Sequence, residues 1–164
     1  LTTFLAAWWS TTHRTGTGGG GIALTVLLWS GLVGTLCGGP LADRIGRRRV
    51  IAAALALATP CLVATFLAGD APWTLPLLGL GGAFLFAPFS VMVVLGQEYL
   101  PRHLGTAAGM TLGMALTVGG IAAPLLGALA DRRGVQAMLL AVSWIPLLAA
   151  LLAVRLPDPA SHRG

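Results

Sequence analysis

Five long apolar runs occupy most of this chain, and they constrain its fold more than any other feature. A helix that crosses a bilayer needs roughly 20 mostly apolar residues, and each run reaches that length. The runs are Ile22–Ala42, Val50–Gly69, Leu75–Gln97, Leu104–Ala130 and Val135–Val154. Leu1–Trp9 is apolar but too short to span, so we interpret it as the end of a helix whose start is missing. The sequence therefore predicts an all-α, multi-pass membrane protein.

The charge of the chain is low and unevenly placed. Charged residues make up 9% of the sequence, against roughly 25% in soluble domains. All ten basic residues are arginine, and they leave a net charge of +5. They gather in the short connectors between apolar runs, which fits control of membrane topology and not nucleic-acid binding. We therefore expect the lipid bilayer as a partner and no nucleic acid.

The arginines also predict an orientation, because connectors on the cytoplasmic side of a membrane carry an excess of positive charge. Alternating spans place seven arginines on one side and three on the other. The richer side holds the 43–49 connector and the C-terminus, which we place in the cytoplasm. Trp8, Trp9 and Trp73 then fall near the outer interface, where indole rings prefer to lie.

The connectors divide the chain into one helical bundle, residues 1–156, and a cytoplasmic tail, residues 157–164. We predict a Thr/Gly loop, a basic hinge and three further short connections at Ser10–Gly21, Asp43–Arg49, Gly69–Pro72, Glu98–His103 and Asp131–Gly134. Four predicted spans contain an interior proline, at Pro60, Pro88, Pro124 and Pro146. Proline kinks a helix, which suits helices that must bend, but proline is also commoner in spanning helices generally.

A compact charged motif follows the first full span. It runs Gly39-Pro-Leu-Ala-Asp43-Arg44-Ile-Gly46-Arg47-Arg48-Arg49, and a similar pattern, Gly127-Ala-Leu-Ala-Asp131-Arg132-Arg-Gly134, follows the fourth. The two copies are three spans apart, so they must lie on opposite faces of the membrane. Two inverted three-helix repeats produce this arrangement. Chance agreement in a chain rich in Ala, Leu and Gly is the alternative.

The first copy resembles the loop signature of the major facilitator superfamily. It matches that signature at Gly39, Asp43, Arg44, Gly46, Arg47 and Arg48. The signature has half a helix before it here and four spans after it. By resemblance, nearly the whole chain is similar to helices seven to twelve of a twelve-helix permease, with the first helix truncated. This implies a further partner, the missing N-terminal six-helix half.

Two further stretches, together with Thr3-Phe4-Leu5…Trp9, resemble the fosmidomycin-resistance branch of drug exporters. They are Gly96–Pro101, which leads into Gly105–Gly109, and Gly119–Ile121, which leads into Leu126–Asp131. Ala6-Ala7 departs from that pattern, because a Pro and a bulky residue are expected there. The resemblance implies secondary active transport of a small molecule, most plainly efflux of a drug or metabolite by alternating access. Uptake of a small metabolite and a non-transporting membrane scaffold subunit are the alternatives.

The motif can also be interpreted from its chemistry. Gly39 lets its helix approach a neighbour closely, and Gly46 allows a tight turn. Asp43 places a carboxylate where a neighbouring helix N-terminus could receive it, and the arginines can contact anionic headgroups. We expect these residues to form a cytoplasmic latch that gates opening. An ordinary positive-inside loop is the simpler alternative, but it does not account for the glycine and aspartate positions.

Small and bulky residues inside the spans suggest packing and substrate contacts. Gly105, Gly109 and Gly113 form a small-xxx-small stripe that favours close helix packing. Leu1–Trp9 is counted here as the first of six helices. The resemblance implies that the first, second, fourth and fifth of these border a central cavity, while the third and sixth face lipid. Candidate cavity residues are Trp29, Phe84, Thr111 and Met114, although ordinary helix packing also explains them.

The middle of each span lacks ionisable residues, which usually mark proton relays. If protons drive transport, the titrating residue therefore lies outside this fragment. We expect no cofactor, an apolar cavity and a lipophilic substrate. His13, His103 and His162 lie far apart in connectors or the tail, and Cys37 and Cys61 have no histidine nearby. The sequence thus predicts neither a metal site nor an enzyme.

Overall fold

The computed structural model describes residues 2–12, 16–99 and 104–155. These residues are helical except in the short connections between helices and at residue 155. Within these ranges there is no strand. The helices are α1 (Thr2–Thr12), α2 (Gly16–Ile45), α3 (Arg47–Ala68), α4 (Thr74–Tyr99), α5 (Leu104–Arg133), α6 (Val135–Ser143) and α7 (Ile145–Val154). The expected tail at 157–164 and parts of two predicted connectors, 13–15 and 100–103, lie outside the described residues.

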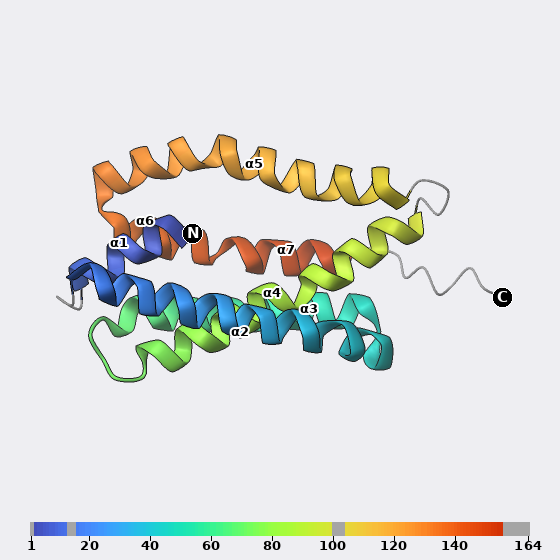
Figure 1. Cartoon of the computed structure of the whole chain (residues 1–164), viewed down its shortest axis with the longest axis horizontal. Helices are drawn as coiled ribbons and strands as arrows, with labels where there is room; N and C mark the ends of the chain where they lie inside the picture. Colours follow the sequence, from blue (N-terminus) through green and yellow to red (C-terminus); the bar gives the residue numbers. More distant parts are fainter. Residues whose placement is uncertain (1, 13–15, 100–103, 156–164) are drawn as a thin grey trace.

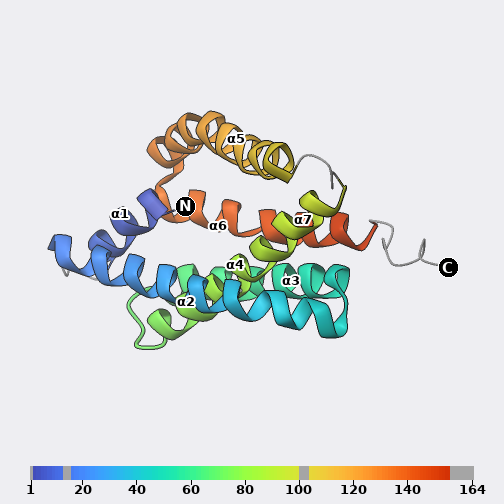
Figure 2. The same cartoon turned by 45° about the vertical axis from the view of Figure 1, so that its right-hand side comes forward.

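The helices run roughly along one common direction (Figure 1). α2 packs against α4, α4 against α3, and α3 against α7, so these four make the body of the bundle. α1 lies across the start of α2. α5 runs along the outside of the bundle in both views, and its closest partners are α4 and α6 (Figures 1 and 2).

Four stretches of the described chain are long and apolar enough to cross a membrane: Gly18–Ile45, Arg47–Ala68, Thr74–Val94 and Val135–Val154. They coincide with four of the five predicted spans, and the predicted all-helical class is confirmed. The remaining run, 104–130, forms most of α5, which has 30 residues. At about 1.5 Å per residue this helix also exceeds the thickness of a bilayer core.

Several predicted connectors are wrong in extent. Asp131–Gly134 is reduced to Gly134 because α5 continues to Arg133, and α4 continues past Glu98 to Tyr99. Ser10–Gly21 was expected to be a loop, but α1 continues to Thr12 and α2 begins at Gly16. Glycine clusters favour loops in water, whereas in lipid a helix satisfies its own backbone hydrogen bonds. Gly20 has a packing reason as well, because a Cβ there would lie 2.8 Å from the Ala6 carbonyl oxygen. The predicted hinge, Asp43–Arg49, shrinks to one non-helical residue, Gly46.

The prolines interrupt the helices at one place in the described chain. The predicted final span is divided at Trp144 into α6 and α7, and Pro146 lies in the first turn of α7. Proline has no backbone N–H to donate, so it is best tolerated in such a first turn. Pro60, Pro88 and Pro124 instead lie inside α3, α4 and α5, which are each one helix.

Two apolar clusters hold the bundle, one toward each end. The larger joins α1, α2, α3, α4 and α6 with the end of α5, and its buried members include Trp8, Trp9 and Phe66. The ring centroids of Trp8 and Phe66 are 5.2 Å apart in an edge-to-face contact, a favourable geometry for aromatic pairs. Trp8 and Trp9 are therefore core residues of the bundle, whereas Trp73 is exposed. Their expected position near the outer interface stays a prediction.

A side-chain hydrogen bond ties α6 to α3 at this same end. The Gln136 side-chain amide donates to the Phe66 carbonyl oxygen at 2.8 Å. The smaller cluster, at the other end, contains Val50, Ile51 and Leu55 of α3 with Ala150 and Ala153 of α7. In an apolar stretch of 18 residues in each helix, half of the α3 residues are buried within the chain, compared with 28% of those in α2 and in α4.

Candidate functional site

The charged motif forms a sharp junction between two spans. α2 ends at Ile45, α3 begins at Arg47, and Gly46 between them has φ 96° and ψ 135°. Such dihedrals are almost confined to glycine. The Gly46 N–H donates to the Ala42 carbonyl at 3.0 Å, and the Gly46 carbonyl accepts from the Val50 N–H at 3.1 Å. Hydrogen bonding thus continues through the reversal, and one residue replaces the predicted hinge.

The signature residues lie on both sides of this junction. Gly39, Asp43 and Arg44 belong to the end of α2, while Arg47 and Arg48 belong to the first turn of α3. Arg44 suits its place, because a cation near a helix C-terminus interacts favourably with the helix dipole. A carboxylate there is unfavourable, so the exposed Asp43 does not stabilise its own helix.

Close approach of α2 to its neighbour occurs at two other glycines. A Cβ on Gly34 or Gly38 would lie well under 3.0 Å from the carbonyl oxygen of Ala83 or Ala87 on α4. At Gly39 the nearest atom to such a Cβ is the Ser90 hydroxyl oxygen at 3.8 Å, an ordinary contact. The close-packing role expected of Gly39 therefore belongs to Gly34 and Gly38.

Two hydroxyl groups reinforce this contact. The Thr35 hydroxyl donates to the Phe86 carbonyl at 3.3 Å and to the Gly31 carbonyl of its own helix at 2.9 Å. The Ser90 hydroxyl donates to the Thr35 carbonyl at 3.2 Å. Interhelical hydrogen bonds from hydroxyls between small residues are typical of packed membrane helices. This contact was not predicted, although the spacings Gly34-xxx-Gly38 and Ala83-xxx-Ala87 are its sequence signal.

The second copy of the motif adopts the same local geometry. Gly134 separates α5 from α6 with φ 85° and ψ 153°. Its N–H donates to the Ala130 carbonyl at 2.8 Å, which matches the Gly46 bond. Asp131 and Arg132 lie in the last turn of α5, as Asp43 and Arg44 do in α2. The two junctions lie at opposite ends of the bundle (Figure 1). This fits inverted repeats, whose full layout stays a prediction.

The other candidate residues are dispersed over several helices. A Cβ at Gly105, Gly109 or Gly113 of α5 would meet nothing within 4 Å, so described residues do not cover this stripe. The cavity candidates lie on α2 (Trp29), α4 (Phe84) and α5 (Thr111 and Met114), and Trp29 and Met114 are exposed. Their roles in packing and substrate binding stay predictions.

Several apolar spans, joined by single-glycine reversals and held by small-residue contacts, define a multi-pass helical membrane protein. The whole chain, residues 1–164, matches the Major Facilitator Superfamily. The chain therefore belongs to this family of membrane transporters, as the signature around Gly46 predicted.

Two curated proteins are similar in sequence to this chain. The chain is 41% identical to an uncharacterized MFS-type transporter, YfnC, of Bacillus subtilis over 138 residues, which are 84% of this chain and 33% of that protein. It is 34% identical to a fosmidomycin resistance protein of Escherichia coli over 136 residues, 82% of this chain and 33% of that protein. The matched region is about one third of each relative's length.

Proposed function

We propose that this chain is half of a secondary active transporter that exports a small, lipophilic molecule by alternating access. The observation that carries the proposal is the match of residues 1–164 to the Major Facilitator Superfamily. Similarity to a fosmidomycin resistance protein favours efflux over uptake. The apolar spans, which lack ionisable residues near their middles, favour a lipophilic substrate over a sugar or phosphate.

An exposed apolar stripe on α2 supports the need for a second half. Ile22, Trp29 and Leu36 recur at steps of seven residues and are all more than half exposed, and Leu32 lies between two of them. Residues at this spacing share one helix face. With each relative about three times as long as the matched region, we assign this stripe to the boundary with the missing six helices. Trp29 would then border the substrate cavity.

In this proposal the Gly46 junction is part of a cytoplasmic gate. Asp43 is exposed at the end of α2, where its charge opposes the dipole of its own helix. Its carboxylate is therefore better satisfied by a donor from another helix, and that contact can form and break as the halves rock. The junction at Gly46 joins the end of α2, which carries Asp43, directly to the start of α3, which carries Arg47. The two helix ends therefore move together as the halves rock.

Drug-susceptibility measurements on the intact protein test this function. We expect a drug-sensitive host that expresses it to tolerate a several-fold higher concentration of at least one lipophilic drug in a panel. Asp43→Asn should abolish most of this tolerance without changing the amount of protein in the membrane, because it removes the charge of the gate. Asp131→Asn is the matched control, and we expect a smaller loss there.

The other candidate functions give different results in the same assay. An uptake permease would make the host more sensitive to a substrate drug. A scaffold subunit would leave tolerance unchanged throughout a panel of drugs. Full tolerance with Asp43→Asn would contradict the gate and leave only a positive-inside loop.

A further inference from the structure

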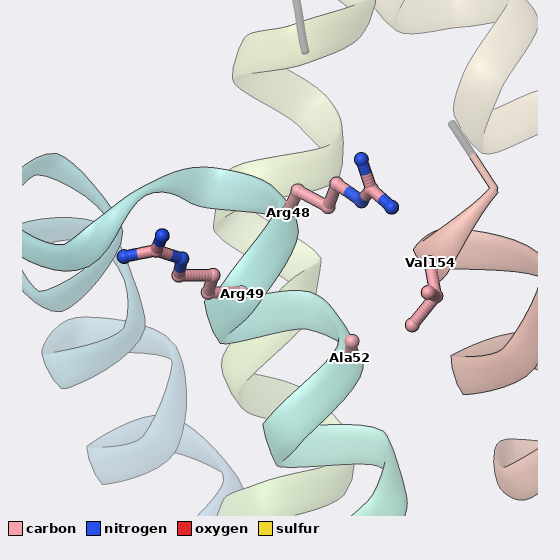
Figure 3. A pocket seen from close by; sticks show the side chains of 4 residues that line it. All are labelled: Arg48, Arg49, Ala52 and Val154. Carbon is pink, nitrogen blue, oxygen red and sulfur yellow. The ribbon is translucent and has the colours of Figure 1, made fainter. Parts of the chain in front are cut away.

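A pocket of about 350 Å³ lies where the first turn of α3 meets the end of α7. Arg48, Arg49, Ala52 and Val154 line it. Ala52 and Val154 face each other across the gap between the two helices (Figure 3). The Arg48 side chain extends over this gap, and the Arg49 side chain extends to the other side of α3 (Figure 3). The gap is thus lined by the Arg48 guanidinium and by two apolar side chains, while Arg49 borders the pocket with its guanidinium directed away from it.

The charge around this pocket favours an anionic ligand. Residues 43–49 contain four arginines and one aspartate, and the exposed Arg155 directly follows Val154. Guanidinium groups bind phosphate oxygens through paired, charge-assisted hydrogen bonds. A phosphate group is therefore the chemistry that these side chains fit best.

The depth of the pocket identifies the source of that phosphate. Arg48 and Arg49 lie in the first turn of the span Arg47–Ala68, and Val154 is the last residue of the span Val135–Val154. Both are span ends, so the pocket lies at the level of lipid headgroups, whichever side of the membrane it faces. Ala52 is one turn deeper, toward the hydrocarbon. Free phosphate would make no use of the apolar half of the lining, whereas a phospholipid presents both parts at this depth.

We propose that this pocket binds an anionic phospholipid, with the phosphate at Arg48 and the glycerol and upper acyl region against Ala52 and Val154. The small Ala52 and Ala149 side chains, packed beside the cluster of Val50, Ile51 and Ala153, leave room for such a molecule. The site does not depend on the direction of transport or on the substrate. A lipid bound there would brace α3 against α7 beside the Gly46 junction.

Native mass spectrometry of the intact, purified protein tests the proposal with phosphatidylglycerol and phosphatidylcholine as probes. We expect the wild type to bind phosphatidylglycerol in preference to phosphatidylcholine. Arg48→Gln should weaken phosphatidylglycerol binding about fivefold, the effect of one arginine at a membrane surface. Arg48→Lys should retain most of the binding, and Arg133→Gln, at the other end of the bundle, should retain all of it.

Three results would contradict the proposed phospholipid site. One is equal binding of the two lipids to the wild type. Another is an equal loss with Arg48→Gln and Arg133→Gln, which would mean diffuse attraction to basic residues. The third is full competition by water-soluble glycerol phosphate, which would mean that the apolar lining contributes nothing. An unchanged circular dichroism spectrum of Arg48→Gln is the control for folding, and transport activity does not enter the readout.

Discussion

Gly34→Ala should destabilise the protein by about 3 kcal/mol, the upper end of the usual range for overpacking a tight contact. The added Cβ would lie well under 3.0 Å from the Ala83 carbonyl oxygen, which is backbone and cannot rotate away. α2 and α4 must therefore separate, which also strains the hydrogen bonds of Thr35 and Ser90 across the interface. Unfolding of the purified intact protein in detergent, followed by circular dichroism, measures the loss.

The matched control for this substitution is Gly21→Ala on the same helix. A Cβ at Gly21 would meet nothing within 4 Å, so we expect no loss and a gain of up to about 1 kcal/mol from helix propensity. Gly39→Ala should also be mild, since its nearest neighbour would be the Ser90 hydroxyl at 3.8 Å. If Gly34→Ala and Gly21→Ala were equally stable, the close contact between α2 and α4 would be refuted.

Replacing either junction glycine by alanine should cost about 1–3 kcal/mol, the usual cost of a non-glycine residue in a disfavoured backbone region. Gly46 has φ 96° and Gly134 has φ 85°, so alanine is strained at both positions. A Cβ meets nothing within 4 Å at either glycine. The strain is therefore confined to the backbone, and we expect the two substitutions to have similar effects in the same unfolding measurement.

Gly120→Ala provides the control for the junction variants. Gly120 lies inside α5, also with open space at its Cβ position, but it is not among the positive-φ glycines. We expect Gly120→Ala to be neutral or slightly stabilising. Wild-type stability of Gly46→Ala would show that the reversal between α2 and α3 does not need glycine.

The helices could be predicted because hydrophobic length depends little on tertiary context. Each apolar run is long enough to satisfy its backbone only as a helix in lipid. The helix ends were harder to predict. Gly16–Gly21 resembles a loop by composition, yet it begins α2, because glycine also permits the close crossing of α1 at Gly20. The same residue type thus serves loops, reversals and helix contacts.

The candidate site was predictable to a similar degree. The signature located Gly46, and the second copy of the motif located Gly134, because backbone reversals depend on local residue types. Which small-residue stripe packs within the chain was not predictable. Gly105, Gly109 and Gly113 carry as good a pattern as Gly34 and Gly38, yet only the latter pair meets a neighbouring helix among the described residues. The choice depends on which helices become neighbours, and that is a property of the whole fold.

Cysteine labelling tests most directly the central claim that the two glycine junctions face opposite sides of a membrane, with Gly46 inside the cell. Cys37 and Cys61 are first replaced by alanine, and Ile45→Cys and Arg133→Cys are then made one at a time in the intact protein. Ile45 and Arg133 are both exposed next to their junctions. An impermeant maleimide should label Arg133→Cys in intact cells, and Ile45→Cys only in inside-out vesicles. Labelling of both from the same side, or of Ile45→Cys from outside, would contradict the claim.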